Sequence, residues 1–419
     1  MKTAKFLILL ICFFTTGSML VAGNGSTYSR FGVGEIITYA GSRTAAMGGT
    51  GIALLSDNYV NSENPAALGL LTRVQYSGDF QYQGYDVSDG AHSTFLSSGN
   101  IQAAMLAMPV YNQYSITLAF GITPFSRTAY AVRDPELQAA QNIVQIYNGS
   151  GGLSSAQASV SFSPARDLYL GATAHYLFGN FDLRQQLEYP DAGFFASDAE
   201  RHVSMNGFAY TFGGAVSGLD NVLGVSTEKR VNLAATVFTG SILNASEQTI
   251  ENFTTSKETT SVFAGTAKIP LGIALGLEYQ PRERLILTAD LQFGQWGQYS
   301  YMGVHPRELR NSTRFGIGGE FSPAAAFGEA YYKQVVYRAG GYVNASNLVV
   351  DGEAINEYFV TGGIGVPIFS SLGSEARLNI SLEYGIRGTT SNGLQRDKIT
   401  RLTISLNGSD TWFVPPEVE

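Results

Sequence analysis

The sequence has few of the residues that soluble enzymes and disulfide-bonded secreted proteins depend on. Its 419 residues include one cysteine and four histidines, and only 14% are charged. An ordinary soluble protein carries about 25% charged residues, so this chain has too few to cover a fully wetted surface. Only the extreme N-terminus approaches the roughly 18 apolar residues that a membrane-spanning helix needs. A polytopic helical membrane protein is therefore excluded, and an ordinary soluble domain is disfavoured.

Aromatic residues and glycine are abundant instead. The chain contains 25 Phe, 23 Tyr and 48 Gly, and its hydrophobic content is 44%. This composition is typical of an outer-membrane β-barrel, which hides its apolar half by alternation along each strand. The formal net charge of −8 argues against nucleic acid as a partner, since nucleic-acid binders need a basic surface.

The N-terminus has the features of a cleaved export signal. Within residues 1–23, Lys2 and Lys5 precede a short apolar stretch at 6–14, and small residues follow. Cleavage there would remove Cys12, the only cysteine. The mature chain would then have no disulfide and no cysteine-based metal or nucleophile site. We expect export to the bacterial outer membrane.

Residues 73–408 repeat one pattern, in which apolar and polar residues alternate over 10–14 positions between turn residues. At 376–387, for example, Leu382, Tyr384 and Ile386 share one face and Glu383 and Arg387 the other. The pattern predicts an all-β, transmembrane antiparallel barrel of about 14 strands. The expected strands are 73–86, 99–111, 113–131, 153–164, 166–184, 200–219, 229–244, 258–280, 284–301, 311–322, 333–345, 356–368, 374–388 and 396–408.

The connections between these segments alternate in length. Those expected at the periplasmic side are mostly short, and those expected outside are long: 132–152, 185–199, 245–257 and 345–355. This parity fits a barrel with both ends of the chain inside, and residues 409–419 form a periplasmic tail. Aromatic residues near strand ends are interpreted as membrane-interface girdles: Tyr82, Tyr85, Trp296, Tyr299, Tyr301 and Trp412.

Residues 24–72 do not alternate and are rich in small residues. Since a barrel of about 14 strands would leak if empty, this segment is expected to fold inside it as a plug, or hatch. Its glycines Gly48, Gly49 and Gly51 allow a close approach to the wall.

The hatch sequence resembles that of the FadL-type family of outer-membrane transporters of long-chain fatty acids and other hydrophobic compounds. The resemblance lies in Ala46-Met47-Gly48-Gly49, in Asp57 and in Asn64-Pro65-Ala66, and it continues at 269–272, 277–281 and 287–291. It implies a barrel of 14 strands plugged by its N-terminus and a passive route for hydrophobic molecules. Arg43 and Asp57 are candidate hatch residues for ion pairs with the wall.

The connection 132–152 carries apolar residues at helical spacing. Leu137, Ile143, Val144 and Tyr147 fall on one face, and Pro135 and Gly149 punctuate the ends. We interpret it as an external loop helix. Its apolar face, together with Ile146, either captures ligand or packs on neighbouring loops.

Pro124 lies inside the long third segment. Proline donates no hydrogen bond to a sheet, so it marks a bulge or a gap. In the family that the sequence resembles, the third strand has a kink linked to lateral exit into the membrane. We therefore predict a lateral gate at 121–125, with Gly121, Pro124 and Phe125, against the alternative of a strand end.

Five charged residues are expected to face the lumen: Glu278, Asp290, Arg377, Glu383 and Arg387. Buried charges are costly unless paired, so pairing among themselves or with the hatch is favoured. Binding of a ligand carboxylate by Arg377 or Arg387 is the alternative.

No motif for catalysis, a metal or a soluble cofactor is present among the four histidines and the carboxylates. We expect no enzyme, and a channel for passive uptake of long-chain fatty acids or similar hydrophobic molecules. Its partners are the ligand, outer-membrane lipid and the barrel-assembly machinery that inserts it. The alternative is a scaffold or shuttle barrel of a protein secretion system, as in the related PorV-like barrels.

Overall fold

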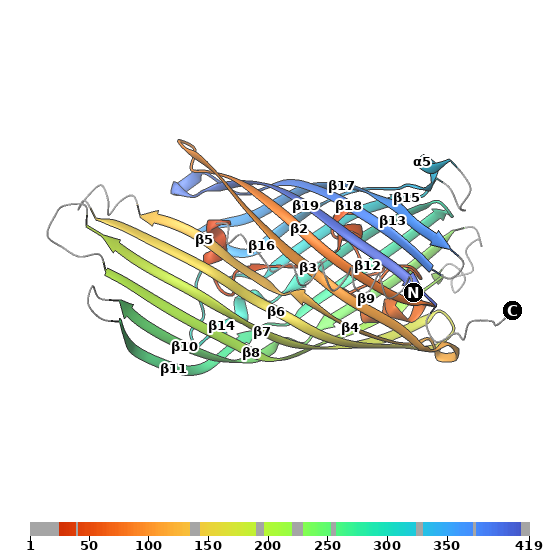
Figure 1. Cartoon of the computed structure of the whole chain (residues 1–419), viewed down its shortest axis with the longest axis horizontal. Helices are drawn as coiled ribbons and strands as arrows, with labels where there is room; N and C mark the ends of the chain where they lie inside the picture. The colour runs from red at the N-terminus through yellow and green to blue at the C-terminus, as the bar shows by residue number, and fades with distance from the viewer. Residues whose placement is uncertain are drawn as a thin grey trace, which may run out of the picture.

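The wall of the molecule is a single antiparallel sheet that closes on itself around the N-terminal segment (Figure 1). A computed structural model describes residues 25–38, 41–134, 143–189, 197–219, 229–252, 257–323, 330–371 and 374–411. Closure comes from pairing of the last strand, β19 (Arg396–Asp410), with β2 (Val74–Ser88) over the full length of both.

The strands between them follow one another around the barrel in chain order. They are β3 (Ser93–Tyr111), β4 (Ile116–Pro124), β5 (Ser126–Asp134), β6 (Val144–Ala165), β7 (Leu168–Glu188), β8 (Ser197–Val216), β9 (Arg230–Phe238), β10 (Ser241–Asn252), β11 (Lys257–Ile269), β12 (Gly272–Arg282), β13 (Leu285–Gly294), β14 (Ser300–Tyr301), β15 (Ser312–Phe321), β16 (Val336–Val350), β17 (Glu353–Ser371) and β18 (Ser374–Gly388). Short helices connect some of them: η3 (Asn112–Tyr114), η4 (Trp296–Gln298), α5 (Tyr331–Gln334) and η5 (Ser391–Gly393).

Four of the wall strands are broken in the middle. β4 and β5 both pair with β6, and β9 and β10 both pair with β8, so each couple is one crossing of the wall. The same holds for β11 with β12, and for β13 with β14. Counting each couple once gives 14 wall strands in the described part of the chain. The predicted fold class and strand number are confirmed.

The two-residue alternation directs apolar side chains to the outside. On β18, Leu382, Tyr384 and Ile386 are exposed on the outer face, whereas Glu383 and Arg387 are buried inside. In an open channel, water would form hydrogen bonds with the inward-facing polar side chains. Because this lumen is filled, those side chains need partners within the protein. The hatch supplies many of them.

The strands extend further at the outer end than the sequence pattern indicated. The predicted outer loop 345–355 is wrong: β16 and β17 continue to a two-residue turn at Asp351 and Gly352, both with positive φ. Such a turn matches the twist of paired strands. Alternation continues through the segment, with Leu348, Val350 and Ile355 buried inside.

The external loop helix at 132–152 is also wrong. Val144, Ile146 and Tyr147 lie on β6, which pairs with both β5 and β7, and Leu137 lies outside the described residues. Two β-branched residues alternating with polar ones suit a strand, and pairing on both sides satisfies the backbone. In a strand Tyr147 points away from the face of Val144 and Ile146, so these residues do not form one apolar groove. Ile143 precedes the strand.

The hatch lies inside the barrel (Figure 1). Its elements are η1 (Thr27–Arg30), β1 (Glu35–Ile36), α2 (Ser42–Ala46) and η2 (Pro65–Leu70), joined by turns. In the described part of the chain, no helix is long and apolar enough to cross a membrane. The expected export signal and the end of the periplasmic tail lie outside the described residues.

Candidate functional site

One hatch turn packs backbone against backbone on the wall. Gly48 has φ +69°, and the turn lies against inward-facing glycines of β15 and β16. A Cβ added to Gly340 would lie 2.5 Å from the carbonyl carbon of Met47, and one added to Gly318 would lie 2.6 Å from the same atom. Glycine is therefore required on both sides of this contact.

A second turn packs in the same way on the opposite side. Asn64 caps η2: its Oδ1 accepts from the backbone nitrogen of Ala66 at 3.0 Å, and its Nδ2 donates to Ile52 O at 2.8 Å. A Cβ added to Gly171 on β7 would lie 2.6 Å from Ala66 N. The Asn64-Pro65-Ala66 motif thus fixes the shape of the hatch and its contact with the wall.

Two of the predicted lumen carboxylates hold hatch amides instead of pairing with cations. Asp290 Oδ2 accepts from the backbone nitrogens of Gly51 and Ile52, at 2.7 and 3.0 Å. Glu278 accepts from the backbone nitrogen of Leu55 at 3.0 Å and from Asn232 Nδ2 at 2.8 Å. Hydrogen bonds from amides to a carboxylate are strong, so these contacts fix the middle of the hatch.

Arg43 is the main ionic contact between hatch and wall at the periplasmic end. Its Nε and Nη2 each donate to Glu320 at 2.8 Å, and Arg338 Nε donates to the same carboxylate at 2.7 Å. Glu320 and Arg338 were not among the predicted site residues, although both alternate with apolar neighbours. Asp57 is exposed, and its carbonyl oxygen accepts from Gln75.

The remaining predicted charges lie in two groups. Arg377 pairs with Glu375 at 3.3 Å near the periplasmic end. Arg387 donates to Glu357 at 2.6 Å and also pairs with Glu35 of the hatch, whereas Glu383 lies 3.8 Å from the guanidinium of Arg401. Arg387 thus pairs with the hatch, whereas the partners of Arg377 and Glu383 are the wall residues Glu375 and Arg401, outside the predicted set.

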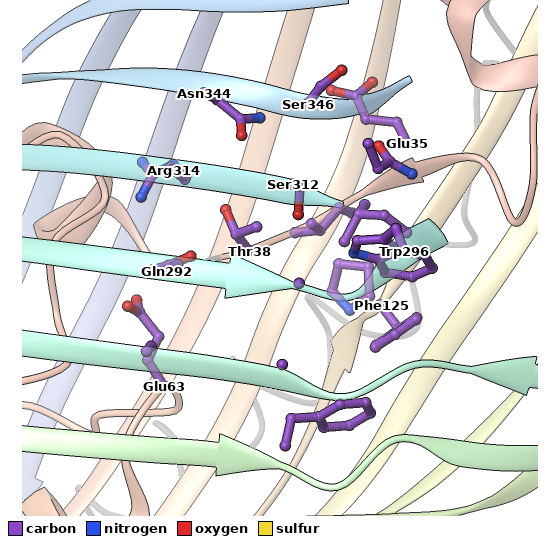
Figure 2. Close-up of a pocket in the computed structure, with 18 of the residues that line it drawn as sticks. Glu35, Thr38, Glu63, Phe125, Gln292, Trp296, Ser312, Arg314, Asn344 and Ser346 are labelled. Carbon is purple, nitrogen blue, oxygen red and sulfur yellow. The ribbon is translucent and has the colours of Figure 1, made fainter. Parts of the chain in front are cut away.

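A cavity of about 360 Å³ lies between the hatch and the outer half of the wall. Figure 2 shows Glu35 and Glu63 reaching it from two hatch segments, with Phe125 and Trp296 together at one end. Its lining is divided between apolar and polar groups. The apolar side includes Phe125, Phe238, Leu271 and Trp296, and the polar side includes Gln81, Gln83, Arg127, Arg387 and Arg401.

An inward-facing apolar cluster covers the cavity on the outer side. It contains Phe181, Met205 and Tyr299, with Trp296 only 9% exposed. The interpretation of Tyr85, Trp296 and Tyr299 as interface aromatics is therefore wrong, because they are buried inside the barrel. Tyr85 shares the inward face of β2 with Gln81 and Gln83, as two-residue alternation requires. Trp296 and Tyr299 follow the end of β13 at Gly294, where the strand is broken.

The wall is interrupted near Pro124. Pairing of β3 with β4 ends at Ala104 and Ile122. Beyond that point β5 pairs with β6 on one side and with the hatch strand β1 on the other. Gly121 and Pro124 lie at the end of β4, and the carbonyl of Phe125 accepts from Ile37 N at 3.1 Å. A hatch strand thus occupies the edge that β3 leaves.

His175 is the histidine that faces the cavity. Its Nδ1 lies 3.0 Å from Ser155 Oγ, and its Nε2 lies 2.9 Å from Thr211 Oγ1. A serine and a histidine therefore meet, but the third position holds a threonine, which supplies no charge to orient and stabilise an imidazolium. Among the described residues, no group of three or more metal-binding side chains comes together.

Comparison with known protein families identifies the family of this chain. The BamG family matches residues 2–417 of the chain. This protein belongs to the BamG family. No curated protein matches the BamG chain described here.

Solved structures share the fold of this BamG protein at low sequence identity. A FadL homologue of Pseudomonas aeruginosa is 14% identical, with TM-score 0.61 over 90% of this chain and 99% of its own. The toluene transporter TbuX of Ralstonia pickettii is 14% identical, with TM-score 0.60 over 89% and 99%. The toluene transporter TodX of Pseudomonas putida is 15% identical, with TM-score 0.57 over 91% and 100%. The chain thus has the same fold as these barrels.

Proposed function

We propose that the protein is an outer-membrane channel that admits long-chain fatty acids or other hydrophobic small molecules. The observation that carries the proposal is the cavity of about 360 Å³, with an apolar side and a polar side, beside an interruption of the wall. Ligand sites are concave and mostly apolar, with a few polar groups that fix orientation. Among the similar structures are the toluene transporter TbuX and the monoaromatic hydrocarbon channel CymD.

The route in this proposal runs through the apolar cluster to the cavity and then sideways. Gly121, Pro124 and Phe125 border the place where β3 and β5 separate, and the strand β1 covers it. Release of β1 would join the cavity to the lipid phase. Exit sideways suits an apolar ligand, because it avoids transfer into water.

Uptake of labelled oleate into cells with and without the protein tests this function. Thr236 lines the cavity and the neighbouring Val237 faces outward, so Thr236→Phe and Val237→Phe form a matched pair. We expect Thr236→Phe to reduce uptake toward that of cells lacking the protein, and Val237→Phe to leave it unchanged. Equal uptake with and without the protein would refute the proposal.

A second candidate is an accessory role in barrel assembly or protein secretion. The name of the BamG family points to barrel assembly, and the hatch is held by contacts with many wall strands, as a structural plug would be. Under this hypothesis the protein acts as a scaffold and the cavity is not used. Depletion would then lower the amounts of other outer-membrane barrels, and Thr236→Phe would restore them as well as the wild type does.

A further inference from the structure

The carboxylate of Glu35 occupies a position that a ligand head group would also suit. Its Oε1 accepts from Arg401 Nη2 at 2.9 Å and from Arg387 Nη2, and its Oε2 accepts from Tyr85 Oη at 3.3 Å. All three partners belong to the wall and are buried. Two guanidinium groups and a phenol around one carboxylate form an anion-binding site, which the hatch fills with its own side chain.

Glu35 also holds the segment that covers the wall interruption. It belongs to β1, whose pairing with β5 is only two residues long, Glu35 with Arg127 and Ile36 with Ser126. One further backbone bond, from Ile37 N to Phe125 O, extends the contact. We call residues 33–38 the strap. So short a pairing is weak by itself, so the Glu35 ion pairs are a main attachment of the strap.

The cavity joins the two features. Glu35, Arg387 and Arg401 line it together with Phe125 and Trp296, and Figure 2 shows Glu35 and Phe125 facing the same space. A molecule whose tail lies against the aromatic side chains can bring an anionic head to the arginines that Glu35 occupies. Two carboxylates cannot both accept from the same Nη2 atoms of Arg387 and Arg401 at once.

We propose that Glu35 is a built-in competitor for an anionic head group, and that a ligand carboxylate binding to Arg387 and Arg401 releases the strap from β5. This inference rests on the proposed channel function and names the ligand class as amphipathic carboxylates. Neutral hydrophobic molecules enter the same cavity without displacing Glu35. The site thereby couples recognition of the head group to opening of the wall.

Binding of two probes to the purified protein in detergent tests the competition. Oleate carries a carboxylate, and oleyl alcohol has the same tail without it. Removing the competitor with Glu35→Gln should lower the Kd for oleate roughly tenfold and leave that for oleyl alcohol unchanged. Glu375→Gln is the control, because Glu375 pairs with Arg377 far from the strap. Glu35→Asp keeps the charge and should show a smaller change.

A disulfide tests the strap. Ile36 and Ser126 are register partners, and the chain has no cysteine besides Cys12, so Ile36→Cys with Ser126→Cys forms one defined link. Oxidation should stop oleate uptake and reduction should restore it. The control pair, Leu382→Cys with Leu402→Cys, links two wall strands and should have no effect.

The outcomes separate the inference from the proposed function. The competition is overturned if Glu35→Gln changes the Kd equally for both probes, or changes it for neither. The channel function stands in both cases, provided that oleate still binds. If no variant binds either probe, the channel function fails. Hydrogen exchange of residues 33–38 tests whether Glu35 attaches the strap to the wall. Faster exchange in Glu35→Gln than in Glu375→Gln supports the attachment, and equal exchange overturns it.

Discussion

The contact between Gly340 on β16 and the hatch turn at Met47 and Gly48 gives a sharp prediction, because a single added methyl group would disrupt it. In Gly340→Ala, the new Cβ would lie 2.5 Å from Met47 C and 2.6 Å from Gly48 N. Both are backbone atoms, so no side chain can rotate away and the hatch turn must move. Overpacking of this kind typically costs about 1–3 kcal/mol. The wall strand itself keeps its hydrogen bonds.

The matched control is Gly362→Ala on the adjacent strand, where the nearest atom to the new Cβ is Arg338 O at 3.7 Å. Hydrogen exchange of the hatch peptide 42–55 measures the effect, since local opening follows the free energy lost. A cost of about 1–3 kcal/mol predicts exchange roughly 5- to 150-fold faster in Gly340→Ala. Gly362→Ala should match the wild type. Equal exchange in the two variants would refute the close packing of hatch on wall.

Three further predictions concern the hatch. Asp290→Asn should speed exchange of the Gly51 and Ile52 amides by about tenfold or more, since hydrogen bonds to charged groups contribute about 1.5–3 kcal/mol; unchanged protection would refute this role. Asn64→Ala removes the cap of η2 and should increase protease cleavage of the hatch with the barrel intact, and wild-type resistance would contradict it. Burial, with nearby Asp290, raises the pKa of Glu63 to about 8, above its ordinary 4.5. The folded hatch then binds a proton more tightly than the unfolded one, so its protection should fall between about pH 4.5 and 8, and Glu63→Gln should weaken this dependence.

The barrel was predictable because its signal is repeated in every strand. Alternation directs apolar residues such as Leu382 to the outside and polar residues such as Glu383 to the inside, and the same rule recurs around the wall. The ends of the strands were less predictable, because polar residues that leave the membrane still pair in hairpins. Ile143, Val144 and Tyr147 fit a helical spacing, but over so short a stretch the spacing does not exclude a strand. Pairing of β6 with two neighbouring strands decides for the strand.

The site was only partly predictable. Pro124 and the Asn64-Pro65-Ala66 motif have conformational signals that are visible in the sequence, and the structure places them at the wall interruption and at a hatch contact. Glu35 has no such signal, because its importance comes from Arg387 and Arg401, which lie more than 350 residues away. Long-range partners of this kind follow only from closure of the barrel.

Quenching of Trp296 by a brominated fatty acid tests the central claim most directly. Trp296 lines the cavity, and the chain has only one other tryptophan, Trp412, so Trp412→Phe leaves a single reporter. A hydrophobic ligand in the cavity predicts saturable quenching by 9,10-dibromostearate, and Thr236→Phe, but not Val237→Phe, should remove it. Absence of quenching at saturating ligand, or equal quenching in both variants, would contradict the assignment of this cavity as the ligand site.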